Sequence, residues 1–225
     1  MLLEEGFIVT MLGRDIEKFR AFTYALDPPS GVRNLNFMSG SITDDGYLDE
    51  VVSFQTERYG ALDLLVNNAG VSGYRPVAEL DAAFVDNQLA VNLRAVIVLT
   101  NKCLPLLRKA VGLRGSAQVV NTASNAGKRG EPMLATYSAA KFGVVGFTEA
   151  LHSELAGEGI KATAICPGLT DTDMADDARA AGAVDMIQPS DVAETVRLTT
   201  RLSTSCVIPE VVLLRPVEWI MPPEV

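Results

Sequence analysis

Residues 119–148 read VVNTASNAGKRGEPMLATYSAAKFGVVGFT, and this stretch decides the fold because two periodicities meet in it. Residues 118–122 are mainly β-branched and polar, without helical spacing, which predicts a buried strand. From Leu134 to Gly157 the apolar residues have the spacing of a long helix, and another β-branched run follows at residues 160–165. Strands joined by a helical crossover run parallel, so this stretch predicts one strand–helix–strand unit of a parallel sheet.

The same alternation of short β-branched runs and longer helical patterns extends to both ends of the chain. Several of the runs are continuously apolar, as strands covered on both faces are. Strands are predicted at residues 7–12, 32–37, 62–66, 118–122, 160–165 and 207–214. Helices are predicted at residues 15–25, 44–59, 76–108, 134–157 and 189–202. We therefore expect an α/β fold, with a three-layer, doubly wound parallel sheet in one domain spanning residues 1–225.

The composition is that of a soluble globular protein with one hydrophobic core. The 225 residues are 48% hydrophobic and 21% charged. A net charge of -9 disfavours nucleic acid and anionic membrane surfaces as partners, because both are negatively charged. The sequence has no CxxC pair and one histidine, His152, so we expect no metal site. Because the N-terminus does not read as a signal peptide and no apolar run approaches the roughly 18 residues of a membrane span, we expect a cytoplasmic protein.

Residues 171–188, DTDMADDARAAGAVDMIQ, form an acidic segment with many small residues and weak periodicity. Two interpretations of this segment are open. It is either a mobile lid or an ordinary surface loop with a short helix. Pro189, Ser190 and Asp191 then have the residue types of a capped helix start.

Ser124, Tyr137 and Lys141 are the candidate catalytic residues. Ser124 lies just beyond the carboxyl end of a predicted strand, where ligands bind in open α/β sheets. Tyr137 and Lys141 are four residues apart on the next predicted helix and share one face. A lysine ammonium would lower the pKa of a phenol, and a serine hydroxyl would hold a substrate oxygen while the tyrosine exchanges a proton with it. A tyrosine–lysine pair at this spacing is also common on solvated helices, so the pair alone leaves both interpretations open.

Several motifs, in the same order along the chain, resemble those of the classical short-chain dehydrogenase/reductase family. They are Asn67-Asn68-Ala69-Gly70 after a strand, Asn92 in AVNL, Ser124, Tyr137 and Lys141 in YSAAK, and Pro167-Gly168 followed by Thr170 and Thr172. The resemblance covers essentially the whole chain. It implies a Rossmann-like fold, an oxidoreductase activity, and a homodimer or homotetramer.

The resemblance also implies a role for each catalytic residue. Tyr137 would act as acid/base on the substrate hydroxyl or carbonyl, and Ser124 would position that oxygen. Lys141 would lower the pKa of Tyr137 and bind the nicotinamide ribose, and Asn92 would hold a water that links Lys141 to solvent. Hydride would pass between NADP(H) and the substrate carbon, which interconverts a secondary alcohol and a carbonyl compound.

The cofactor-binding residues implied by the resemblance are Arg14, Ser41, Ile42, Asn67, Tyr137, Lys141, Thr170 and Thr172. NAD-preferring members of the family carry an acid at the end of the second strand. The equivalent residue here is Gly13, and the Arg14 cation that follows suits a 2′-phosphate. We therefore expect NADP in preference to NAD. NAD remains an alternative cofactor for two reasons. Asp15 follows one position later, and Arg14 could be an ordinary surface residue.

The start of the chain departs from the family pattern, in which a strand and a TGxxxGxG turn bind the pyrophosphate. Neither is found here, and the first six residues resemble the end of the helix that follows this turn. We therefore expect an N-terminally truncated member, which binds NADPH more weakly than an extended version because the pyrophosphate loses its helix N-terminus. The two strands that flank the absent one would either pair directly or leave a gap.

Two functions follow from these observations. The first is an NADP-dependent oxidoreductase acting on a small secondary alcohol or carbonyl compound. The alternative is a non-catalytic interaction module, derived from the same family, which cannot bind cofactor because the phosphate loop is absent. The sequence does not specify the substrate.

Overall fold

The computed structural model describes residues 1–25, 34–180 and 182–216, and the chain divides into two compact units, Met1–Arg58 and Tyr59–Val225. Each unit has its own parallel sheet. Two compact units can belong to a single domain, so the expectation of one domain over residues 1–225 stays a prediction.

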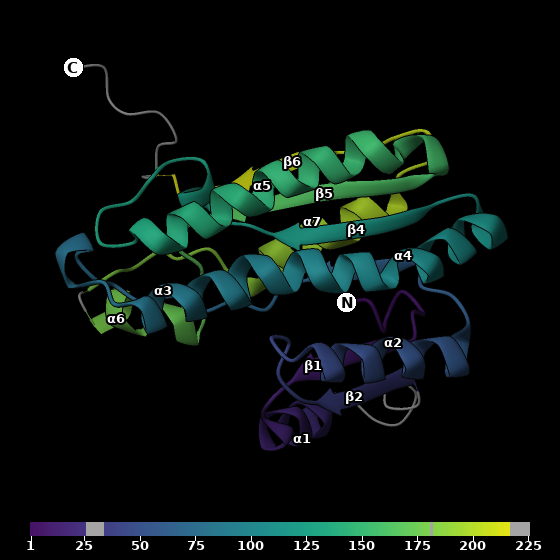
Figure 1. The fold of residues 1–225 in the computed structure, drawn as a ribbon, viewed down its shortest axis with the longest axis horizontal. Coiled ribbons are helices and arrows are strands. Elements are labelled where there is room, and N and C mark those ends of the chain that lie inside the picture. The colour runs from purple at the N-terminus through teal and green to yellow at the C-terminus, as the bar shows by residue number, and fades with distance from the viewer. Residues whose placement is uncertain (26–33, 181, 217–225) are drawn as a thin grey trace. The chain divides into compact units, whose positions relative to one another are not determined.

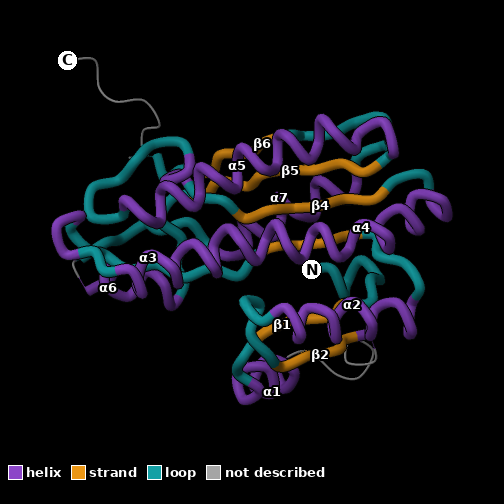
Figure 2. Tube along the Cα trace, viewed as in Figure 1, coloured by secondary structure: helices purple, strands orange, loops and turns teal. Residues whose placement is uncertain are grey.

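The first unit consists of a two-stranded parallel sheet and two helices (Figures 1 and 2). Strands β1 (Val9–Gly13) and β2 (Leu35–Ser39) pair along their whole length. Helix α1 (Ile16–Ala25) packs on β2 through stacked rings of Phe19 and Phe37, whose centroids are 4.3 Å apart. Helix α2 (Asp45–Tyr59) is tied to the same strand, because the Tyr47 hydroxyl donates a 2.7 Å hydrogen bond to the Met38 carbonyl. The unit thus has the alternation of strands and helices that the sequence predicts.

The second unit contains a four-stranded parallel sheet in the order β3-β4-β5-β6. Its strands are β3 (Leu64–Asn67), β4 (Ala117–Thr122), β5 (Ile160–Pro167) and β6 (Glu210–Leu213). Helices α4 (Ala95–Arg114) and α5 (Ala135–Leu155) cover one face and α7 (Pro189–Arg201) covers the other (Figure 1). Every residue of β5 is buried, as expected for a central strand covered on both faces. The unit has the expected three-layer, Rossmann-like α/β architecture.

The stretch 76–108, which the sequence predicts as one helix, contains several elements. A 3-10 turn at Val77–Glu79 is followed by α3 (Ala82–Leu89), a wide π-helical turn at Ala90–Arg94, and α4. The carboxylate of Asp81 accepts a 2.8 Å hydrogen bond from the Phe84 N–H and starts α3 there. The predicted helix is therefore wrong at its start, because the Asp81 cap begins it at Ala82; from there it is continuous to Arg114, with the π turn inside it.

The continuous stretch Ala82–Arg114 is also long and apolar enough to cross a membrane, by length and composition. The expectation that no apolar stretch approaches the length of a membrane span is therefore wrong. The core helix of a globular protein passes the same test. In α4, the side chains of Leu99, Leu107 and Ala110 are buried in the core of the second unit. The expectation of no membrane partner stays a prediction.

Strands β1 and β3, which we expected to flank the family's first strand, belong to different sheets. In the described ranges β1 pairs with β2, and β3 pairs with β4. Direct pairing of β1 with β3 was one of the two expected alternatives, and it is not observed in this part of the chain.

A buried chain of polar side chains joins the sheet of the second unit to the helices on its face. The Asn67 amide donates to Thr100 of α4 at 3.0 Å and to the Asn121 side-chain oxygen on β4 at 2.8 Å. Asn121 in turn donates to the Thr148 hydroxyl of α5 at 2.9 Å. All four side chains are buried, so each hydrogen bond replaces one that water would otherwise make. The network fixes how α4 and α5 sit on β3 and β4.

Replacing Asn121 with alanine should lower the free energy of unfolding by about 3 kcal/mol, since it leaves the Asn67 amide without an acceptor and opens a cavity. Urea denaturation measures this change. Asn87→Ala, at an exposed position on α3, is the matched control and should change stability by less than about 0.5 kcal/mol. A similar loss in both variants would contradict the structural role of the network.

Candidate active site

Ser124 lies in the loop that leaves the carboxyl end of β4. Its hydroxyl accepts a 3.1 Å hydrogen bond from the Ala126 N–H and caps a single 3-10 turn, Asn125–Gly127. This turn packs directly on α5, because a Cβ atom at Gly127 would lie 2.7 Å from the Lys141 carbonyl oxygen. The turn needs glycine at position 127 for this close approach. The loop therefore carries Ser124 to the helix that bears the other two candidate residues.

Tyr137 and Lys141 lie one turn apart on α5 and come together with Ser124 as the sequence predicts. The Ser124 side chain lies close enough to that of Tyr137 to lower the pKa of the phenol. The Lys141 ammonium lies 5.7 Å from the centroid of the Tyr137 ring and donates a 2.7 Å hydrogen bond to the Thr122 carbonyl at the end of β4. Three candidate catalytic residues thus meet at the carboxyl end of the sheet.

Burial determines the acidity of both titratable groups in this cluster. The pKa of Tyr137 is raised, because burial penalises the phenolate; the nearby Ser124 side chain acts in the opposite direction. Burial lowers the pKa of Lys141 to about 8. The expected lowering of the Tyr137 pKa by Lys141 is therefore not found in this structure. The ammonium is directed to the Thr122 carbonyl, and desolvation of the phenol is the larger effect.

Asn92 lies in the π-helical turn and is fully buried. Its side chain accepts from the Val71 N–H at 3.0 Å and donates to the Val71 carbonyl at 2.9 Å and to Gln88 at 2.8 Å. A Cβ atom at Gly70 would lie 3.1 Å from the Asn92 side-chain oxygen and 3.8 Å from the Lys141 ammonium, which places Asn92 beside the cluster. The water-holding role of Asn92 stays a prediction.

Gln88 belongs to this site, and the sequence analysis missed it. It is buried and orients the Asn92 amide from one helical turn earlier. A polar residue four positions before Asn92 was the available signal, but the same spacing also occurs on solvated helix faces.

The other expected cofactor-binding residues fall into two groups. In the first unit, Arg14 and Ser41 follow the adjacent carboxyl ends of β1 and β2, where the Ser39 hydroxyl donates to the Arg14 carbonyl at 3.2 Å. Ser41 shares a 2.8 Å hydrogen bond with Thr43, and Ile42 lies between them. Asp15, which kept NAD open, accepts from two N–H groups at the start of α1.

In the second unit, Asn67 lies in the buried network, and Thr170 and Thr172 follow β5. The Thr170 hydroxyl donates to the Gly168 carbonyl at 3.1 Å, whereas Thr172 is exposed. Asn67 therefore has a structural role in this network, and each threonine hydroxyl donates to a nearby backbone carbonyl.

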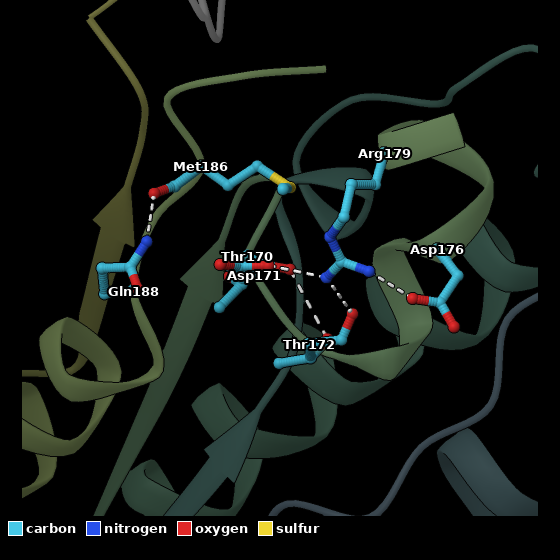
Figure 3. Close-up of polar contacts among 7 residues, drawn as sticks. All are labelled: Thr170, Asp171, Thr172, Asp176, Arg179, Met186 and Gln188. Carbon is cyan, nitrogen blue, oxygen red and sulfur yellow. Dashed lines mark hydrogen bonds and ion pairs between the residues drawn. The ribbon is translucent and has the colours of Figure 1, made fainter. Parts of the chain in front are cut away.

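The segment 171–188 contains a 3-10 turn, Asp173–Ala175, and a short helix, α6 (Asp176–Ala180). Figure 3 shows the Arg179 guanidinium bridging Asp171 and Asp176 and reaching the Thr172 carbonyl. The segment carries Met174 to the site, since its methyl group would lie 3.8 Å from a Cβ atom at Gly70. The structure thus shows the short helix of the second interpretation, and motion of the segment as a lid stays a prediction.

Comparisons with known proteins identify the family of this chain. A sequence model of short chain dehydrogenases matches residues 1–182. The chain belongs to the short-chain dehydrogenase family. A Streptomyces coelicolor protein with the provisional name ketoacyl reductase is 45% identical over 130 residues, 57% of this chain. The 3-oxoacyl-(acyl-carrier-protein) reductase of Synechocystis is 31% identical over 166 residues, 71% of this chain and 66% of its own.

Solved structures with the same fold include short-chain dehydrogenase relatives with bound cofactor. A variant of actinorhodin polyketide ketoreductase with NADPH has a TM-score of 0.83 and 32% identity, covering 95% of this chain and 87% of its own. ElxO with NADP bound has the same TM-score at 22% identity, which shows likeness of fold. The sequence matches are shorter: the chain spans 48% of the Streptomyces coelicolor protein, about half the length of such curated relatives.

Removing the Lys141 ammonium should change how stability depends on pH. A folded-state pKa of about 8, against an ordinary 10.5, means that the charged form is disfavoured in the folded protein. This penalty is present below pH 8 and disappears as the pH rises to 10.5. The free energy of unfolding of the wild type relative to Lys141→Met should therefore rise by about 3 kcal/mol over this interval.

Urea denaturation of both proteins at several pH values measures how the difference in their free energies of unfolding changes with pH. Lys109→Met is the matched control, because Lys109 is exposed on α4 and its ammonium stays in water. A constant difference between wild type and Lys141→Met across the interval would show that Lys141 is not desolvated as described.

Proposed function

We propose that this chain is an NADP(H)-dependent oxidoreductase that interconverts a carbonyl compound and a secondary alcohol. The observation that carries the proposal is the meeting of Ser124, Tyr137 and Lys141 at the carboxyl end of the sheet, where Lys141 lies 5.7 Å from the centre of the Tyr137 ring. Membership of the short-chain dehydrogenase family supports it, as do relatives named as ketoacyl reductases.

The surroundings of Lys141 fit a nicotinamide nucleotide. Its ammonium has three N–H donors, and within the described residues the Thr122 carbonyl is the one acceptor that it contacts by a hydrogen bond. A buried ammonium needs further acceptors, which the hydroxyls of a ribose would supply. Gly70 leaves open the space that a side chain would fill between Asn92 and Lys141. Lys141, Thr170 and Thr172 would hold the nicotinamide end of the cofactor, which supplies or accepts the hydride.

Tyr137 is suited to donate a proton in the direction of carbonyl reduction. Its raised pKa keeps the phenol protonated at neutral pH. Ser124, which lies near Tyr137, would hold the substrate oxygen within reach of that proton. When the proton leaves, the nearby Lys141 ammonium would stabilise the phenolate. The site thus favours a ketone substrate over an alcohol at neutral pH.

Replacing Tyr137 with phenylalanine should lower kcat for ketone reduction by about a thousandfold or more, because the variant lacks the acidic proton. NADPH affinity, measured by fluorescence titration, should change by less than about twofold, since the ring remains in place. Tyr24→Phe, at a position 88% exposed on α1, is the control and should keep wild-type kcat.

Two results would contradict this proposal. Comparable turnover by Tyr137→Phe would exclude the acid/base role of Tyr137. Absence of both NADPH binding and turnover in the wild type would favour the alternative, a non-catalytic interaction module.

We propose NADP in preference to NAD. Arg14 follows β1, and the NADP-bound structural neighbours support the choice. Arg14→Ala should weaken NADPH binding by about tenfold while NADH binding changes little, because the guanidinium meets a group that only the phosphorylated cofactor carries. Titration of both cofactors measures the ratio. Arg20→Ala on α1 is the matched control, and an equal loss for NADPH and NADH in Arg14→Ala would refute the assignment.

We also propose a homodimer or homotetramer and a cytoplasmic location, with no nucleic-acid or membrane partner. Exposed Ile97 on α4 and Phe142 on α5 support self-association, since both are apolar and lie on the outer surfaces of long helices. The net charge of -9 supports the absence of polyanionic partners.

A further inference from the structure

The Lys128 side chain connects the loop after Ser124 to the last strand of the sheet. Its ammonium lies 2.9 Å from a carboxylate oxygen of Glu210 on β6, 82 positions away in sequence. Both side chains are about one quarter exposed, 28% for Lys128 and 27% for Glu210. The hydrogen bond from Lys128 to Glu210 raises the pKa of Lys128. This cation is therefore engaged within the protein by an ion pair.

Lys128 closes the turn that Ser124 opens. The Gly127 N–H donates to the Ser124 carbonyl at 2.9 Å, and the Lys128 N–H donates to the Asn125 carbonyl at 2.9 Å. The turn is thus held by the Ser124 cap at its beginning and by the contact of Gly127 with α5 at its middle. The ion pair with Glu210 holds its end.

Glu210 is a firm anchor for this end of the turn. It lies in β6, opposite Ala164 of β5, in the ladder of the parallel sheet. Every residue of β5 is buried, so Glu210 is paired with a strand of the core. A partly buried ion pair between two ordered backbones loses less to solvent and side-chain entropy than an exposed one.

We propose that the Lys128–Glu210 ion pair positions Ser124 for catalysis. By fixing the far end of the turn to β6, the pair keeps the Ser124 hydroxyl near Tyr137. In this proposal Lys128 and Glu210 act through Ser124, so they are positioning residues. The catalytic part of this inference rests on the proposed oxidoreductase function; the structural part does not.

Steady-state kinetics of Glu210→Gln, Lys128→Met and the double variant test the catalytic part. Each should lower kcat for ketone reduction by about tenfold, since displacement of a catalytic group by a fraction of an ångström has effects of this size. KM for the ketone and the affinity for NADPH should stay within about twofold of wild type. The double variant should lose no more than either single one, because both act through one contact. Lys128→Arg preserves the pair and should retain kcat.

Glu158→Gln is the matched control, since it removes the 2.6 Å ion pair between Arg108 and Glu158, which joins two other segments of the same unit. This variant should keep wild-type kcat. Wild-type kcat in Glu210→Gln, additive losses in the double variant, or an equal loss in Glu158→Gln would each overturn the proposal.

Amide hydrogen exchange tests the structural part without turnover. The N–H groups of Gly127, Lys128 and Arg129 donate within the turn and should exchange about tenfold faster in Glu210→Gln, as expected for a locally opened segment. They should be unchanged in Glu158→Gln, and the charge-swapped variant K128E/E210K should recover protection. Unchanged exchange in Glu210→Gln refutes the pair as an anchor. A wild-type protein without turnover would refute the proposed function. The exchange result would still show whether the Lys128–Glu210 ion pair holds the end of the turn.

Discussion

The buried ammonium of Lys141, with its hydrogen bond to the Thr122 carbonyl, is the contact on which the candidate site depends. Through it, the first third of α5 is fixed to the last residue of β4, and the loop after β4 packs against that helix. Gly127 allows the loop to follow this path, because any side chain there would collide with the Lys141 carbonyl. The position of Ser124 beside Tyr137 is a consequence of these two constraints.

Burial has opposite effects on the two titratable groups of the cluster. Burial raises the pKa of Tyr137 and lowers the pKa of Lys141. As the pH rises, the lysine therefore loses its proton before the tyrosine does, and a phenolate–ammonium pair is not the resting arrangement of this structure. A phenolate would form here only when the proton passes to an acceptor beside Tyr137.

Much of the fold could be predicted from sequence, because the buried strands are short, continuously apolar and separated by helical patterns. The helices predicted at residues 44–59 and 189–202 lie within one residue of α2 and α7. The meeting of Ser124 with Tyr137 could be predicted from family motifs. The direction of the Tyr137 pKa could not, since it depends on how much of the ring other segments cover. The Lys128–Glu210 pair was equally hidden, because nothing in the local sequence pairs residues 82 positions apart.

The π-helical turn at Ala90–Arg94 has a consequence for how this part of the chain tolerates change in length. A π turn accommodates one residue more than an α turn, and each residue of a helix accounts for about 100° of rotation about its axis. The turn therefore sets the rotational phase of α3 relative to α4. Loss of one residue there would turn Gln88 away from Asn92 while α4 kept its contacts with the sheet. The extra residue thus sets the direction in which the side chains of α3 point relative to those of α4.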